Sequence, residues 1–165
     1  MNAPPLNGSG AARIFRDLAP AAMERLASVS EQLQLATSEP LLSGRPDQGH
    51  DVWIVVEGRI RVFRELNPAG DVTLGEIGPG GLVGEFAAIH GVAGTAKAEA
   101  VGPSVVVRVP REAFLAVLEE HPRVTLRLCE HLITLVRALD QRLVALEGLD
   151  RAVDSTLKRL FLATL

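Results

Sequence analysis

Cysteine is nearly absent from this sequence of 165 residues, and its scarcity excludes several classes of protein. The single thiol, Cys129, cannot form an internal disulfide, a zinc knuckle or a cysteine-ligated iron–sulfur cluster. It lies in a leucine-rich stretch, where a buried, inert thiol is a better interpretation than a nucleophile. A chain with one thiol fits a reducing compartment, and we expect the cytoplasm.

Long apolar runs and an excess of one charge are also missing. No apolar run, the mostly apolar stretch from Leu132 to Val136 included, approaches the roughly 18 residues that a membrane-spanning helix needs, so we expect no membrane partner. Residues 1–10 have neither the basic start nor the apolar stretch of a signal peptide. With 17 basic against 20 acidic residues, the net charge is −3, which leaves no overall electrostatic footprint for nucleic acid.

Catalytic motifs are missing as well. The sequence contains no Gly-x-Ser-x-Gly elbow and no phosphate-binding loop that ends in Gly-Lys-Ser/Thr. Its four histidines, His50, His90, His121 and His131, include no pair at the spacing of metal ligands. We therefore expect no metal site and no enzyme, and an enzyme with a jelly-roll-like core is the last of the functions considered.

What the sequence has instead is glycine, because ten of its 15 glycines fall between residues 58 and 102. These glycines separate short apolar or β-branched runs. Many short strands joined by glycine turns predict an antiparallel sandwich or barrel. The runs are Val52–Val56, Ile60–Phe63, Val72–Ile77 and Ser104–Val109.

Helices are predicted on both sides of this region. A helical lead-in covers residues 14–29, and after His121-Pro122 the pattern predicts one long helix to about Glu147. Six leucines recur there over 18 residues in five steps, or 3.6 residues per step, which is the α-helical repeat. Gly148 is expected to end this helix. The six leucines are Leu128, Leu132, Leu135, Leu139, Leu143 and Leu146.

The glycine turn at residues 80–84 runs directly into a short helix-like piece. Exposed backbone N–H groups at such a helix start can bind an anion, especially phosphate. Glu85, next to Gly84, is well placed to accept hydrogen bonds from a ribose hydroxyl. A glycine-rich turn with a capping glutamate explains the same residues, and spacing alone does not decide between the two interpretations.

The order of these features resembles the cyclic nucleotide-binding domain of the Crp/Fnr transcription regulators. The resemblance covers about residues 12–165, and its most specific segments are residues 55–62 (VVEGRIRV), 83–89 (VGEFAAI) and 109–114 (VPREAF). It implies a mainly β fold with α-helices. The expected architecture is a double-stranded β-helix, or jelly-roll-like β-roll, with flanking helices and a long C-terminal dimerisation helix.

The resemblance and the composition together predict four segments. The last of them would be a hinge and the first helix of a truncated or missing DNA-binding domain, because the winged helix-turn-helix of these regulators is lacking. The segments are a flexible N-terminus (1–11), the β-roll (12–120), the dimerisation helix (121–148) and the hinge with its helix (149–165).

The resemblance also implies an effector pocket built on a phosphate-binding cassette. The family's phosphate-binding arginine falls on Gly94 and its base-contacting hydroxyl on Leu139, so both contacts are missing. The nearest basic residue, Lys97, lies three places along an extended strand and faces the other side. The effector is expected to be a cyclic nucleotide, cyclic AMP or cyclic GMP, or otherwise an unknown ligand. The expected ligand-binding residues are Gly84, Glu85, Phe86, Gly94, Thr95 and Ala96.

A regulator of this kind is expected to be a homodimer that binds a small-molecule effector and reaches DNA only through a C-terminal domain absent from these residues. Two alternatives stay open. One is a dimerisation scaffold that binds no nucleotide, which the residues Gly94 and Leu139 favour. The other is a sensor of another ligand such as haem, with His90 as a ligand. The expected dimer interface consists of Leu128, Leu132, Leu135, Leu139 and Leu143.

Overall fold

The chain forms two compact units in this computed structural model, Met1–Thr125 and Leu126–Leu165. The structure describes residues 13–45, 49–66, 68, 70–92 and 94–163, with side chains up to residue 146. The predicted flexible N-terminus, residues 1–11, lies outside the described residues. The strands belong to the first unit, and the second unit consists of the greater part of one long helix, α4 (Pro122–Ala163).

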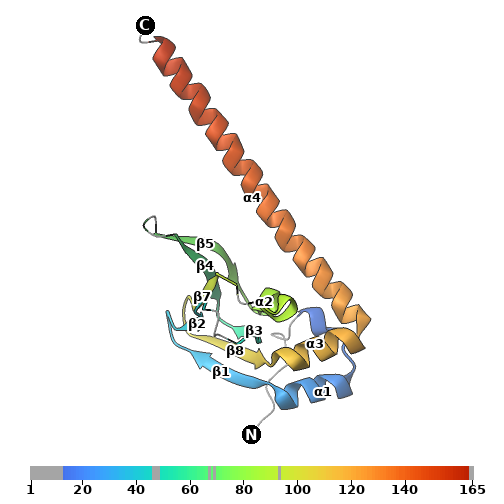
Figure 1. Cartoon of the computed structure of the whole chain (residues 1–165). Helices are drawn as coiled ribbons and strands as arrows, with labels where there is room; N and C mark the ends of the chain where they lie inside the picture. The colour runs from blue at the N-terminus through green and yellow to red at the C-terminus, as the bar shows by residue number, and fades with distance from the viewer. Residues whose placement is uncertain (1–12, 46–48, 67, 69, 93, 164–165) are drawn as a thin grey trace. The chain divides into compact units, whose positions relative to one another are not determined.

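The strands form two antiparallel sheets of four strands each. Sheet A has the order β1-β8-β3-β6, and sheet B has the order β2-β7-β4-β5 (Figure 1). Apart from the hairpin of β4 and β5, neighbouring strands come from distant parts of the chain. The two sheets form the double-stranded β-roll that the sequence predicted. The strands are β1 (Glu31–Leu35), β2 (Pro40–Leu42), β3 (Val52–Glu57), β4 (Ile60–Leu66), β5 (Gly70–Ile77), β6 (Leu82–Val83), β7 (Lys97–Ala100) and β8 (Ser104–Val109).

Strand β3 of sheet A is apolar on both faces. Side chains alternate along a strand, so Val52 and Ile54 of β3 lie on one face while Trp53 and Val55 lie on the other. Val52, Ile54 and Val55 are fully buried, and Trp53 is partly buried against the core. A strand that is buried on both sides reads as a continuous apolar run, which explains the sequence Val52–Val56.

Sheet B has one apolar face and one polar face. Ile60 and Val62 of β4 lie on its inner face with Ala98 of β7, and this face packs against sheet A in one hydrophobic cluster. Arg61, between them in the sequence, lies on the outer face opposite Glu99. Alternation of apolar and charged residues is typical of a sheet with one solvated side.

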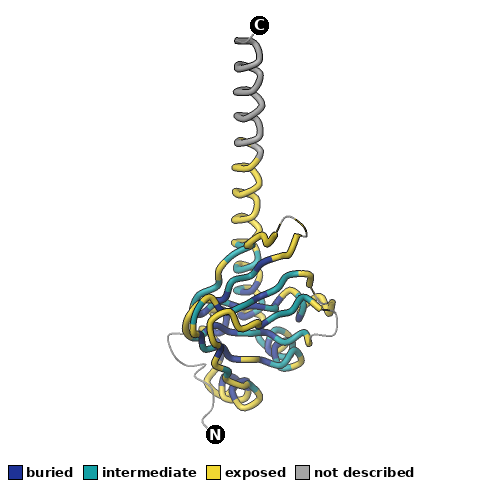
Figure 2. Tube along the Cα trace, turned by 90° about the vertical axis from the view of Figure 1, so that its left-hand side faces the viewer, coloured by how far each residue is buried: buried dark blue, intermediate teal, exposed yellow. Residues whose placement is uncertain are grey.

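Helices complete the first unit. Helix α1 (Pro20–Val29) packs against α3 (Arg111–Glu120), and a short 3₁₀ turn, η1 (Arg13–Phe15), precedes them. The rings of Phe15 and Phe114 meet edge to face, with centroids 6.4 Å apart and an interplanar angle of 75°. Both rings are buried, as are many other residues in the strands and helices of this unit (Figure 2).

Helix α4 begins where the sequence predicted. Helix α3 ends at Glu120, and α4 starts at Pro122, because the residue before a proline avoids helical geometry. Thr125 Oγ1 donates a hydrogen bond of 2.5 Å to the carbonyl oxygen of Leu118, which joins the first turn of α4 to α3. Cys129 is exposed, so the expectation of a buried thiol is wrong.

The C-terminal end of α4 differs from the prediction. The helix continues through Gly148, where we expected a stop and a hinge, and ends at Ala163. One glycine inside a helix costs only about 1 kcal/mol relative to alanine, which a long helix of leucine, alanine, glutamate and arginine tolerates. The division of the chain into functional segments at residues 120 and 148 stays a prediction.

None of the helices in the part of the chain that the structure describes combines the length and the apolar character that a bilayer crossing requires.

Candidate functional site in the β-roll

The segment between β6 and β7 forms a turn, a short helix and a second turn, and we call residues 84–92 and 94–96 the cassette. It opens at Gly84, whose backbone is left-handed with φ of 92°. A Cβ at this position would lie 2.6 Å from the carbonyl oxygen of Asp51, closer than real atoms approach. Only glycine can therefore bring the start of the cassette so close to β3.

Helix α2 (Glu85–His90) is the centre of the cassette, and it is only six residues long. It ends at Gly91, which is again left-handed with φ of 72°. Whether the start of this helix binds an anion or only forms a glycine turn capped by a glutamate stays open.

Glu85 is the buried acid of the cassette. Its side chain is 5% exposed, although a carboxylate is rarely buried without a partner. Burial raises the pKa of Glu85 to about 7, and a hydrogen bond with its own backbone opposes this shift. At neutral pH the group is therefore close to half protonated and can either donate or accept a hydrogen bond.

Arg111, the first residue of helix α3 (Arg111–Glu120), joins this helix to the cassette by a hydrogen bond. Its Nε donates a hydrogen bond of 2.8 Å to the carbonyl oxygen of Ala88, near the end of α2. Its backbone N–H donates to Oδ1 of Asp51 at 3.0 Å, and Arg108 forms an ion pair with the same carboxylate at 2.6 Å. Asp51 thus links β3 and the start of α3 in one polar cluster. Sequence reasoning missed this cluster, because no spacing along the chain indicates it.

The second turn of the cassette is more open. Gly94 and Thr95 are exposed, and the nearest atom to a Cβ at Gly94 would be the backbone nitrogen of Ala96 at 3.9 Å. On one side of this turn, Gly44 packs against the carbonyl oxygens of Thr95 and Ala96. A larger side chain therefore fits at Gly94.

Phe86 lies apart from the rest of the predicted site. Its side chain is 60% exposed, next to the buried Glu85 on α2. The structure thus places Gly84 and Glu85 against β3, Thr95 and Ala96 beside Gly44, and leaves the Phe86 ring open to solvent. Whether these residues bind a ligand remains a prediction.

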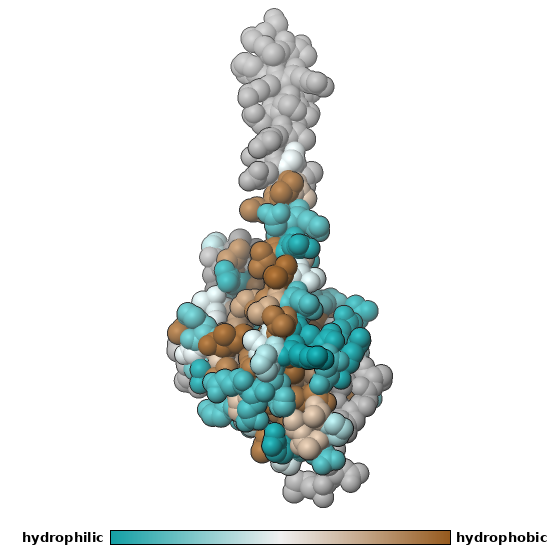
Figure 3. Space-filling model, turned by 90° about the vertical axis from the view of Figure 1, so that its right-hand side faces the viewer, coloured by the Kyte–Doolittle hydropathy of each residue, from teal (hydrophilic) through white to brown (hydrophobic). Residues whose placement is uncertain are grey.

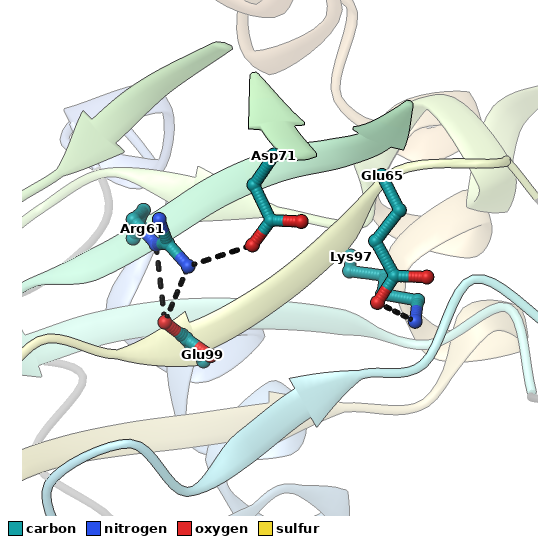
Figure 4. A network of polar contacts seen from close by, with 5 residues as sticks. All are labelled: Arg61, Glu65, Asp71, Lys97 and Glu99. Atoms are coloured by element: carbon teal, nitrogen blue, oxygen red, sulfur yellow. Dashed lines mark hydrogen bonds and ion pairs between the residues drawn. The ribbon is translucent and has the colours of Figure 1, made fainter. Parts of the chain in front are cut away.

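Two cations of sheet B, Arg61 and Lys97, are neutralised on its outer face (Figure 4). Arg61 forms ion pairs with Glu99 at 2.8 Å and with Asp71 at 3.5 Å, and Lys97 pairs with Glu65. The guanidinium of Arg61 also lies 4.2 Å from the ring centre of Phe63. Lys97 therefore does not replace the missing arginine at Gly94.

The described leucines of α4 differ in exposure. Leu128 is buried, Leu132 and Leu135 are half-buried, and Leu139 and Leu143 are 55% and 59% exposed. Exposed apolar side chains on the described part of this helix appear brown in Figure 3. A large apolar stripe in solvent indicates an interaction surface, and its role as a dimer interface remains a prediction.

Metal and haem ligands were also considered. Within the described residues, no three histidine, cysteine, aspartate or glutamate side chains gather as metal ligands do. His90 is exposed at the C-terminal end of α2, so the haem alternative has one accessible candidate ligand and stays a prediction.

Comparison with known proteins identifies this fold and its cassette. The family model described as "Cyclic nucleotide-binding domain" matches residues 33–121, more than half of the chain. The chain belongs to the cyclic nucleotide-binding domain family. The match includes the whole cassette and ends where α3 meets α4, and it supports the resemblance to an effector domain of the Crp type.

Two curated relatives show different settings for the domain. The chain is 28% identical over 130 residues to the Cyclic AMP receptor protein of Thermus thermophilus, covering 79% of this chain and 60% of that protein. It is 24% identical over 129 residues to Lysophospholipase NTE1 of Pyricularia oryzae, covering 78% of this chain and 8% of that protein. The chain thus spans less than two thirds of either relative.

A solved structure supports the fold. The crystal structure of the Thermus thermophilus Catabolite Activator Protein superimposes with a TM-score of 0.68 at 28% identity, over 81% of this chain and 62% of that one. The likeness confirms the predicted β-roll with flanking helices.

The lysophospholipases correct one expectation. From the missing catalytic motifs we expected that the protein is not an enzyme. This expectation is wrong, because the same domain occurs in relatives that are named as enzymes. The motifs that one domain lacks say nothing about the rest of a longer protein.

Proposed function

We propose that this chain is the ligand-sensing and dimerisation domain of a Crp/Fnr-like transcription regulator. The cassette carries the proposal: Gly84 lies against β3, and the adjacent Glu85 is buried inside the domain. A turn without a Cβ leaves the backbone open to a ligand, and a buried carboxylate accepts hydrogen bonds from hydroxyl groups. Similarity to a protein named Cyclic AMP receptor protein supports the same assignment.

The proposed effector is a cyclic nucleotide, cyclic AMP or cyclic GMP. The residues Gly94 and Leu139 predict weak binding, because both lack the polar groups that the resemblance requires. Losing one partner of a buried charge pair costs about 2–5 kcal/mol, which weakens binding by roughly 30-fold or more.

A ligand in the cassette can be sensed through Arg111. The Arg111 side chain donates a hydrogen bond to Ala88 near the end of α2. The backbone N–H of Arg111, at the start of α3, donates a hydrogen bond to Asp51. Movement of α2 would therefore shift α3, to which the first turn of α4 is bonded through Thr125. Ligand binding acts by favouring one of two such arrangements.

The long helix is proposed to pair with its copy in a second chain. Its exposed leucines form an apolar stripe with helical spacing, which is typical of helices that associate. DNA binding would belong to a further domain of a longer protein, and the cytoplasm is the proposed location.

A second function is favoured by Gly94 and Leu139, the two positions that lack the polar residues expected from the resemblance. The domain could serve as a dimerisation scaffold that binds no nucleotide. Both functions predict a dimer, so only ligand binding separates them.

Thermal unfolding with cyclic AMP, cyclic GMP and linear AMP at millimolar concentration tests the proposed function. A ligand at a hundred times its dissociation constant stabilises a protein by about 2.7 kcal/mol, which raises the melting temperature by roughly 5–10 °C for a chain of this size. A shift with a cyclic nucleotide supports sensing. The absence of any shift would contradict nucleotide sensing and favour the scaffold.

A further inference from the structure

Arg64 of β4 lies on the inner face of sheet B, at the end of the strand. Side chains alternate along β4, so Arg64 shares its face with Val62, which packs against the core between the two sheets. Across the sheet, Val62 is paired with Ala98 and Phe63 with Lys97. The next residues in this antiparallel register are Arg64 and Ala96, so Arg64 borders the last residue of the cassette.

Arg64 differs in its ion pairing from the nearby cations Arg61 and Lys97. Arg61 and Lys97 lie on the outer face, and each is bound to carboxylates there (Figure 4). Arg64 is exposed, and no carboxylate in the described part of the chain forms an ion pair with it. Its partner across the hairpin is Val72, an apolar residue. A guanidinium on the inner face is therefore available to an anion.

The cassette turn beside Arg64 lacks a cation of its own. Gly94 has no side chain, and the neighbouring Thr95 and Ala96 contribute no charge. Glu85 is acidic and buried, so an anion bound in the roll needs a positive partner from another element. A planar guanidinium binds two phosphate oxygens at once, which suits this role better than an ammonium group.

We propose that Arg64 binds the phosphate of a nucleotide held at Thr95 and Ala96, and so replaces from β4 the arginine that Gly94 lacks. This inference rests on the proposed function of the domain as a nucleotide sensor. It adds a ligand-binding residue that lies outside the cassette and that the sequence pattern of the cassette does not include.

Arg45 provides a matched control, because it directly follows Gly44, which lies beside the same turn. Its neighbour Gly44 packs against the carbonyl oxygens of Thr95 and Ala96. Arg45 is exposed and, like Arg64, has no ion pair with a described residue. Removing either arginine changes the net charge equally, so a general effect of charge would appear in both variants.

The test is calorimetric titration of the whole chain with cyclic AMP and with adenosine, which lacks the phosphate. Arg64→Ala should weaken cyclic AMP binding by about 30-fold or more, the effect of losing one partner of a charge pair. Arg45→Ala should change it less than about 3-fold, as expected for screened surface charges. Adenosine should bind all these chains equally.

A double variant tests the replacement directly. Gly94→Arg, placed in the Arg64→Ala chain, should restore cyclic AMP binding to at least the level of the unmodified chain. A Cβ at Gly94 meets no clash, since its nearest atom lies at 3.9 Å, and Gly94 is exposed.

Several outcomes would overturn the role of Arg64. These are equal cyclic AMP affinity in Arg64→Ala and the unmodified chain, a larger loss in Arg45→Ala, and equal affinity of the unmodified chain for cyclic AMP and adenosine. If only the chain with Gly94→Arg binds cyclic AMP, the pocket is intact and Arg64 does not serve it. If no chain binds, including the one with Gly94→Arg, the proposed function itself is wrong.

Discussion

Glu85 combines a proposed binding role with an environment that is unfavourable for a charged group. Most of its surface is removed from water, and no cation shifts its pKa downward against this burial. A ligand hydroxyl that donates to the carboxylate would therefore relieve a cost that the free domain bears. Sequence reasoning identified the residue from its place after Gly84, whereas its burial depends on how the cassette packs against β3.

At this scale we predict that Glu85→Gln flattens the pH dependence of stability. The carboxyl ionises near pH 4.5 when unfolded and near 7 when folded, so the folded chain binds more protons between these values and loses stability as pH rises. This pKa shift corresponds to a loss of about 3 kcal/mol of folding stability as the pH rises. The Glu85→Gln variant carries an amide that does not ionise, so it should keep this stability. Denaturant unfolding at pH 5 and pH 8 measures the difference.

The exposed Glu24 of α1 supplies the control for this measurement. Glu24→Gln should follow the unmodified chain at both pH values. The interpretation of Glu85 fails if Glu85→Gln loses as much stability as the unmodified chain between pH 5 and pH 8.

Among the elements, α2 depends on its neighbours more than on its own sequence. Six residues are too few for a stable isolated helix. The Gly84 contact with β3 and the Arg111 hydrogen bond to Ala88 hold its two ends. The sequence predicted the short helix, but Arg111 was only part of a family-like segment and had no predicted partner.

We therefore expect Arg111→Ala to loosen α2. A hydrogen bond from a charged group contributes about 1.5–3 kcal/mol, so the amides of α2 should exchange with solvent about tenfold faster or more. Hydrogen exchange read by mass spectrometry measures this, with Arg25→Ala as the control, because the Arg25–Glu120 pair is exposed. Equal exchange in Arg111→Ala and Arg25→Ala would show that the bond to Ala88 does not hold the helix.

The strands show the same division between local and long-range causes. The long runs of β3, β4, β5 and β8 could be read from β-branched residues between glycines. The two-residue β6 and the short β7 carry too little pattern to be recognised alone. They form because each pairs with a strand from elsewhere, β6 with β3 and β7 with both β2 and β4.

For the whole molecule, the exposed leucines of α4 predict association. An apolar stripe of this kind is unfavourable in water and is stabilised when two copies cover it. We expect a dimer at tens of micromolar in light scattering, and a monomer for the double variant Leu139→Glu/Leu143→Glu. Gln141→Glu, which adds charge to the same helix between them, is the control and should leave the dimer intact. A monomer for the unmodified chain would contradict the proposal.

Composition and pattern by themselves determined the short antiparallel strands between glycine turns and the long helix, because alternation, glycine turns and helical repeats are local properties of a chain. The β-roll and the place of the cassette were expected from the resemblance to the Crp/Fnr regulators. The tertiary structure alone decided which charges are available. Arg61 and Lys97 find carboxylates on the outer face, while Arg64 shares the inner face with Val62 and finds none among the described residues. Strand register settles this, and register depends on pairing between distant segments.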